Sequence, residues 1–233
     1  MTQPLGANTG FRHFHEQLSE LKQRLLDMAG RAEELVDLAV DALRERDAEK
    51  AEAVLAADAE IDALELEVEQ RAISLLALQQ PMARDLRFIV GAIKISSDLE
   101  RVGDHAVNIA QATLRLLDAA AALTPGPEID DMAHRARMML GDALDAFVRA
   151  DGVMGRDVCK RDDEVDALEE TVFRVLLTHM MESPALISSA IQMLLVSRNL
   201  ERVADLATNI AEDAVYLAEG KQIKHHFEER GGR

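Results

Sequence analysis

The chain has 233 residues, of which 48% are apolar and 3% aromatic, and its formal net charge is −17. This acidity argues against nonspecific nucleic-acid binding, which depends on Lys and Arg, and the lack of any run of about 18 apolar residues argues against membrane insertion. The single cysteine, Cys159, leaves no internal disulfide and fits a reducing, cytoplasmic setting.

Six long helices are predicted, because stretches rich in Ala, Leu, Glu and Arg are separated by only a few breakers. The first helix is expected over residues 11–46. Asp47 has the character of an N-cap for the second helix, which is expected to end at Gln80. Pro81 is expected to open the third helix, which runs to Ala122.

The segment 124–127 (TPGP) contains the strongest breakers of the chain and predicts a boundary between two halves. Three further helices follow from the breakers in the second half. They are expected over residues 128–150, from the break at Asp151 and Gly152 to Glu182, and from Pro184 to the end signal Gly220. The charged tail, residues 221–233, is predicted to be disordered.

The two halves resemble each other. Residues 99–110 read LERVGDHAVNIA and residues 200–211 read LERVADLATNIA, so nine of the twelve positions are identical at an offset of 101. Upstream segments match at an offset of 104, which implies a three-residue deletion in the second copy. A repeat on this scale indicates a duplicated unit. The sequence therefore predicts an all-α fold of two tandem three-helix bundles, over residues 11–123 and 128–220.

Each copy carries two pairs of carboxylates spaced four residues apart, so that both members share one face of a helix. Oxygen ligands in this arrangement suit hard or borderline cations such as Mg²⁺, Mn²⁺, Ca²⁺ or iron. His105 follows the first pair and is a further candidate ligand, although Leu206 replaces it in the second copy. The predicted metal ligands are Asp58, Asp62, Glu100, Asp104 and His105 in the first copy, and Asp162, Asp166, Glu201 and Asp205 in the second.

Two simpler interpretations stay open. Acidic pairs arise by chance in an acidic chain, and Arg101 and Arg202 are placed to neutralise them through ion pairs. Recurrence in both copies favours ligation, as does the apolar character of the third helix, which predicts that this helix is buried nearly all round. Buried carboxylates need partners.

The segments SSDLERVGDHAVNIA, with LALQQPMARDLR before it, and RNLERVADLATNIAEDAVYLAEG resemble the PhoU family over about residues 11–220. The resemblance implies two three-helix bundles and a cytoplasmic, non-enzymatic regulator. It implies a negative regulator of the phosphate-starvation response and of phosphate uptake, linking the ATPase subunit of the phosphate ABC transporter to a sensor histidine kinase. It further implies a homodimer and bound metal ions, with iron, Mn, Mg or Zn as candidates.

The second copy departs from the family pattern. Ala204 and Leu206 replace the usual Gly and His, and Asn199 stands where the first copy has Asp98. We therefore expect the first metal site to bind more tightly than the second. The alternatives are a metal-dependent enzyme that uses the same carboxylates, and a helical scaffold stapled by metal or by arginine without a kinase partner.

Overall fold

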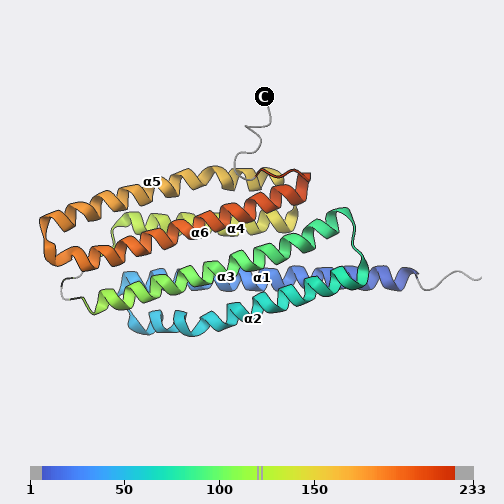
Figure 1. The fold of residues 1–233 in the computed structure, drawn as a ribbon, viewed down its shortest axis with the longest axis horizontal. Coiled ribbons are helices and arrows are strands. Elements are labelled where there is room, and N and C mark those ends of the chain that lie inside the picture. Colours follow the sequence, from blue (N-terminus) through green and yellow to red (C-terminus); the bar gives the residue numbers. More distant parts are fainter. Residues whose placement is uncertain (1–6, 120, 122, 224–233) are drawn as a thin grey trace, which may run out of the picture.

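The structure is a computed structural model that describes residues 7–119, 121 and 123–223. Helices account for nearly all of this part of the chain, which has no strands, and the predicted all-α fold of two tandem three-helix bundles is confirmed (Figure 1). The first bundle contains α1 (Ala7–Glu45), α2 (Ala48–Gln79) and α3 (Ala83–Leu117). The second contains α4 (Pro127–Arg149), α5 (Gly152–Glu182), the 3-10 turn η1 (Pro184–Leu186) and α6 (Ile187–Glu219).

The same cap begins the middle helix of each bundle. Asp47 accepts hydrogen bonds from the second and third amides of α2 at 2.9 and 3.2 Å, and Asp151 does the same for α5 at 3.0 and 3.1 Å. These bonds satisfy amides that have no partner inside the helix. Gly220 ends α6 with a φ of 70°, a left-handed conformation that glycine adopts without strain.

Several helix ends differ from the sequence-based expectation. Pro81 does not open α3, because the reversal from α2 uses a left-handed Gln80 and an extended Met82 before the helix begins at Ala83. Pro184 opens the 3-10 turn instead of α6. At the other end, α3 stops at Leu117, five residues early. The expected endpoint, Ala122, lies outside the described residues, as does the predicted disordered tail from residue 224 onward.

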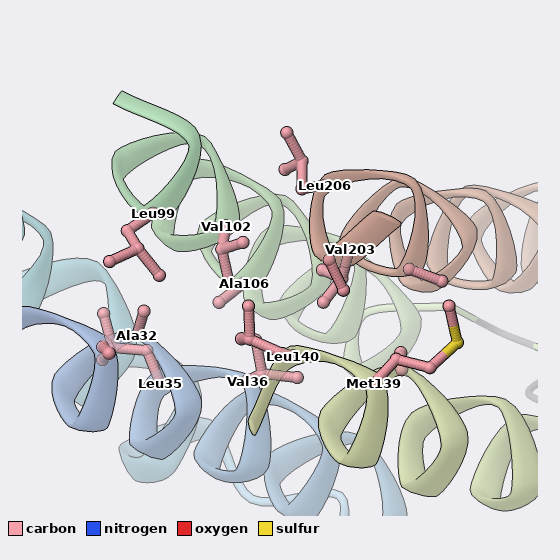
Figure 2. Close-up of a cluster of buried hydrophobic side chains, with 14 of the residues drawn as sticks. Ala32, Leu35, Val36, Leu99, Val102, Ala106, Met139, Leu140, Val203 and Leu206 are labelled. Carbon is pink, nitrogen blue, oxygen red and sulfur yellow. The ribbon is translucent and has the colours of Figure 1, made fainter. Parts of the chain in front are cut away.

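The two bundles pack against each other through α3 and α6, which run antiparallel, and through α1 and α4. Figure 2 shows the resulting two layers, in which Val102 and Ala106 of α3 point toward Val36 of α1 and Val203 of α6 lies above Met139 of α4. All five side chains are 99–100% buried. The apolar area removed from water joins the two repeats into one continuous core.

A charged contact crosses the α3–α6 part of this interface. Asp213 of α6 is only 4% exposed, and its Oδ1 lies 3.4 Å from Nζ of Lys94 in α3. The repeat-related positions are Ala112 and Leu195, so the corresponding contact at the other end of the α3–α6 interface is apolar. The duplication thus left a bundle interface that is only approximately symmetric.

A glycine sets the closest approach of α5 to α6. A Cβ at Gly155 would lie 2.8 Å from the backbone oxygen of Ala211 and 3.0 Å from Val215, so an alanine here requires the helices to move apart. Gly103 of α3 differs, because its added Cβ would meet Ile61 at an ordinary 3.4 Å. In the second repeat Ala204 and the smaller Val165 occupy these two positions, which preserves the packed volume.

We therefore expect Gly155→Ala to lower the free energy of unfolding by about 1–2 kcal/mol, since overpacking exceeds the gain in helix propensity. The matched variant Gly103→Ala should leave stability unchanged or slightly raised. Urea denaturation followed by circular dichroism measures both. Equal stability of the two variants would show that the close approach at Gly155 relaxes without cost.

Candidate functional site

The acidic pairs are brought together by the closest approach of the second and third helices in each bundle. In the first repeat, Ile61 packs against Gly103, and these residues immediately precede Asp62 and Asp104. The spacing of four then brings Asp58 onto the same row as Asp62, and Glu100 onto that of Asp104. The carboxylates of α2 and α3 consequently lie on one surface shared by the two helices.

Helical spacing places this shared surface on the side of the molecule away from α1 and α4. The core side of α3 carries the buried residues Leu99, Val102 and Ala106. Two residues that lie among them in the sequence reach solvent, since Glu100 is half-buried and Asp104 is exposed. The pattern repeats in α6. We call the outer surface of α2, α3, α6 and α5 that carries both sets the acidic face; its residues are Asp58, Asp62, Glu65, Glu100 and Asp104 from the first repeat and Asp162, Asp166, Glu169, Glu201 and Asp205 from the second.

The prediction that the third helix is buried nearly all round is wrong. Leu86 and Val90 are 40% and 38% exposed, and Ile93 is half-buried. All three lie on the stripe of α3 that continues into Glu100 and Asp104, because spacings of three, four and seven residues return to one side of a helix. The acidic face is therefore a solvent-facing surface with an apolar extension.

In the first repeat, partial burial raises the pKa of Glu100 above its ordinary value, and the nearby carboxylates of Asp104, Glu65, Asp62 and Asp58 raise it further. The pKa of Asp58 is also raised, first by burial and then by Asp62 and Asp104. Carboxylates of α2 and α3 thus influence each other between the two helices. The structure brings together the four acids that the sequence predicted as a first site.

Arginine does not neutralise this first cluster. Arg101 lies 3.7 Å from Asp98, one turn away on the same helix, and within the described residues Asp58, Asp62, Glu100 and Asp104 form no hydrogen bond or ion pair. The proposed neutralisation by Arg101 is therefore absent. Mutual repulsion among these carboxylates opposes folding unless a cation or a basic surface binds them.

The second cluster has a similar layout with different charge compensation. Burial and the neighbouring Asp205 and Asp166 raise the pKa of Asp162 to about 6. Burial also raises the pKa values of Asp166 and Glu201, with Asp205 again contributing. Here, however, Arg202 bonds to Asp205 at 2.7 Å and lies 3.4 Å from Glu201, so arginine neutralises part of the second cluster.

One substitution between the repeats explains this difference. Arg101 pairs with the carboxylate of Asp98, three residues before it. The residue three positions before Arg202 is the neutral Asn199, and Arg202 pairs with Asp205 instead. The Oδ1 atom of Asn199 lies 2.9 Å from Nδ1 of His105 across the α3–α6 interface. The amide nitrogen of Asn199 donates to the backbone oxygen of Leu195, and its Oδ1 can only accept, so Nδ1 of His105 donates in this contact.

Among the described residues, no group of three or more His, Cys, Asp or Glu side chains is arranged so that it could hold a metal ion. His105 in particular points along the α3–α6 interface toward Asn199. The predicted ligands therefore lie on one face without forming a complete coordination cage. Mg²⁺ tolerates such a site, since it is commonly held by one or two carboxylates and retains several waters.

Comparison with known proteins identifies the family. The family model for the PhoU domain matches residues 25–113 and 129–214, one match in each bundle. This chain belongs to the PhoU family. It is 41% identical over 217 residues to a "phosphate-specific transport system accessory protein PhoU homolog" of Aquifex aeolicus, covering 93% of this chain and 98% of that protein. A homologue from Clostridium acetobutylicum is 40% identical over 211 residues, covering 90% of this chain and 96% of that protein.

Solved PhoU structures share the architecture. The crystal structure of PhoU from Pseudomonas aeruginosa is 35% identical with a TM-score of 0.85, over 89% of this chain and all of that one. The crystal structure of the phosphate transport system regulatory protein PhoU from Streptococcus pneumoniae is 31% identical with a TM-score of 0.84. The match covers 91% of this chain and 99% of that one. The family consists of regulatory accessory proteins and not of enzymes. No helix in the described ranges is both long and apolar enough to cross a membrane.

The raised pKa of Asp162 predicts how stability depends on pH. A carboxyl whose folded pKa lies above its unfolded value binds its proton more readily in the folded state, so stability falls as the pH rises from about 4 to about 6. Asp162→Asn should remove this loss and stabilise the metal-free protein at pH 7 by about 1 kcal/mol, after allowance for solvent screening.

Thermal unfolding of Asp162→Asn and wild type in a chelating buffer, at several pH values, measures this effect. The exposed neighbour Asp163 provides the control, and Asp163→Asn should change little. A stability gain for Asp162→Asn that stayed constant from pH 4 to pH 7 would contradict the assignment.

Proposed function

We propose that this protein is a cytoplasmic regulator of phosphate-specific transport. Its relatives are described as accessory or regulatory proteins of the phosphate transport system, which supports this role. In this role it represses the phosphate-starvation response and restrains uptake, by linking the ATPase subunit of the phosphate ABC transporter to a sensor histidine kinase. The observation that carries the proposal is the acidic face, which repeats in both bundles and lacks neutralising side chains in the first.

An exposed cluster of like charges reduces stability, so its presence in both repeats favours a binding role over a structural one. Carboxylates grouped on two adjacent helices attract cations and Lys- or Arg-rich protein surfaces. Both kinds of partner relieve the repulsion that α2 and α3 otherwise sustain. This chemistry suits an adaptor whose affinity for its partners depends on which cations are bound.

Metal binding is part of the proposal, with iron, Mn, Mg or Zn as candidate ions. The candidate ligands supply oxygen donors only, and none of them forms an ion pair with a described residue. They are Asp58 and Asp62 from α2 and Glu100 and Asp104 from α3. A bound divalent cation would join the two helices and remove their repulsion. The same stapling would operate if the protein served only transport and had no kinase partner, which is the second candidate function. Self-association as a homodimer stays a prediction.

The two clusters should differ in affinity, because Arg202 occupies the second one. Titration calorimetry with Mn²⁺ should show a tighter and a weaker phase, and Asp104→Ala should remove the tighter one while Asp205→Ala removes the weaker. Arg202→Gln should strengthen the weaker phase. The exposed acid Asp130 on α4 is the control, as Asp130→Ala should alter neither phase. Equal losses from Asp104→Ala and Asp205→Ala would contradict the asymmetry.

Deletion of the gene tests the regulatory role. In cells grown with excess phosphate, alkaline phosphatase activity should rise in the deletion strain and return to the repressed level when the intact gene is restored. Activity that stays low, in a strain without a second family member, would rule out the link to the kinase and leave control of uptake as the function.

A further inference from the structure

Two exposed apolar patches lie on the same outer surface as the acidic face, one at each tip of the molecule. The first patch consists of Ile73 of α2 with Leu86 and Val90 of α3, which are 52%, 40% and 38% exposed. The second consists of Leu177 of α5 with Ile187 and Ile191 of α6, which are 44%, 41% and 45% exposed. Large apolar side chains grouped at the surface typically mark interaction sites.

The two patches are related by the duplication. Leu86 and Val90 correspond to Ile187 and Ile191 at the offset of 101, and Ile73 corresponds to Leu177 at the offset of 104. Other exposed positions on these helices did not keep their character: Lys94 became Leu195 and Leu66 became Glu170. Apolar character has therefore been retained at the patch positions while exposed neighbours diverged.

The antiparallel packing of α3 and α6 fixes the arrangement of these features. Leu86 and Ile187 lie near the first turns of α3 and α6, which are at opposite ends of the molecule in Figure 1. Asp104 and Asp205 lie in the middle of the same two helices. The outer surface of α2, α3, α6 and α5 therefore has a central acidic region and an apolar patch at each end, related by an approximate two-fold axis.

We propose that this surface docks a two-fold-symmetric partner, whose two identical subunits each place an apolar side-chain cluster on one patch and Lys or Arg side chains on the adjacent acidic cluster. The inference rests on the proposed adaptor function and specifies the form of its partner.

Charge argues against a second copy of this chain as the occupant. Face-to-face pairing would oppose two acidic clusters, and like charges brought together at an interface disfavour association. Each repeat contributes five carboxylates to the acidic face, and among the described residues only Arg202 forms ion pairs with any of them. The complementary surface is therefore basic at its centre and apolar at both ends.

The experiment uses the full chain with two purified probes, the ATPase subunit of the phosphate transporter and the cytoplasmic part of the sensor kinase. Native mass spectrometry should show two probe subunits for each chain, with affinity falling as salt rises. Leu86→Gln/Val90→Gln and Ile187→Gln/Ile191→Gln should each weaken binding by about tenfold, as expected for loss of two apolar anchors. The combined variant should not bind detectably.

The controls are Val153→Gln and Met138→Gln, which alter exposed apolar residues outside the surface and should bind normally. Binding of one probe subunit for each chain, or loss of binding from one patch variant only, would overturn the two-fold arrangement while leaving the adaptor function intact. Patch variants that dissociate the chain from its own copies would assign the surface to self-association and overturn the proposal. Failure of wild type to bind either probe would overturn the adaptor function and this inference together.

Discussion

Apolar side chains on one side of α3 and α6 join the two repeats, and this packing decides which residues reach solvent. Val102 and Ala106 are buried on the side of α3 that faces α1, and Val203 is buried on the side of α6 that faces α4. A helix that buries one side presents the opposite side outward, so Glu100 and Asp104 face away from α1. The position of the acidic face, its approximate symmetry and its separation from the α1–α4 layer all follow from this one interface.

Duplication then supplied two versions of the same surface, and small substitutions made them unequal. The exchange of Asp98 for Asn199 redirects an arginine, so that Arg202 neutralises a cluster that Arg101 leaves charged. The exchange of Gly103 for Ala204 has no such effect, because Val165 replaces Ile61 and maintains the packing. Of these two exchanges, only the one that changes a surface charge alters the contacts of its neighbours.

Much of this architecture could be predicted from the sequence. The helix cap at Asp47, the break at Asp151, the duplication and the shared face of each acidic pair depend on local spacing, which the sequence contains. The connections at Pro81 and Pro184 were less predictable, because the path of a chain reversal depends on how the flanking helices meet. The partners of Arg101 and Arg202 were not predictable from the pair itself, since each arginine has acids on both sides and the choice depends on three-dimensional competition.

The exposure of Leu86 and Val90 was missed for a related reason. An apolar helix surface indicates burial against something, and the sequence alone does not distinguish burial in the core from burial against a partner. The structure shows that the chain itself leaves these residues exposed. Repulsion within the adjacent acidic cluster lowers the stability of the isolated chain, and no contact inside the chain offsets it. This is expected for a surface whose residues serve binding.

Thermal unfolding of a variant that neutralises the first cluster tests this account most directly. The variant Asp58→Asn/Asp62→Asn/Glu100→Gln/Asp104→Asn keeps the side-chain shapes and removes the charges. In a chelating buffer at pH 7 it should unfold at a higher temperature than wild type, and Mn²⁺ should stabilise wild type far more than the variant. A variant that unfolds at a lower temperature in the chelating buffer would show that the carboxylates support the fold, and would contradict their assignment to a binding surface.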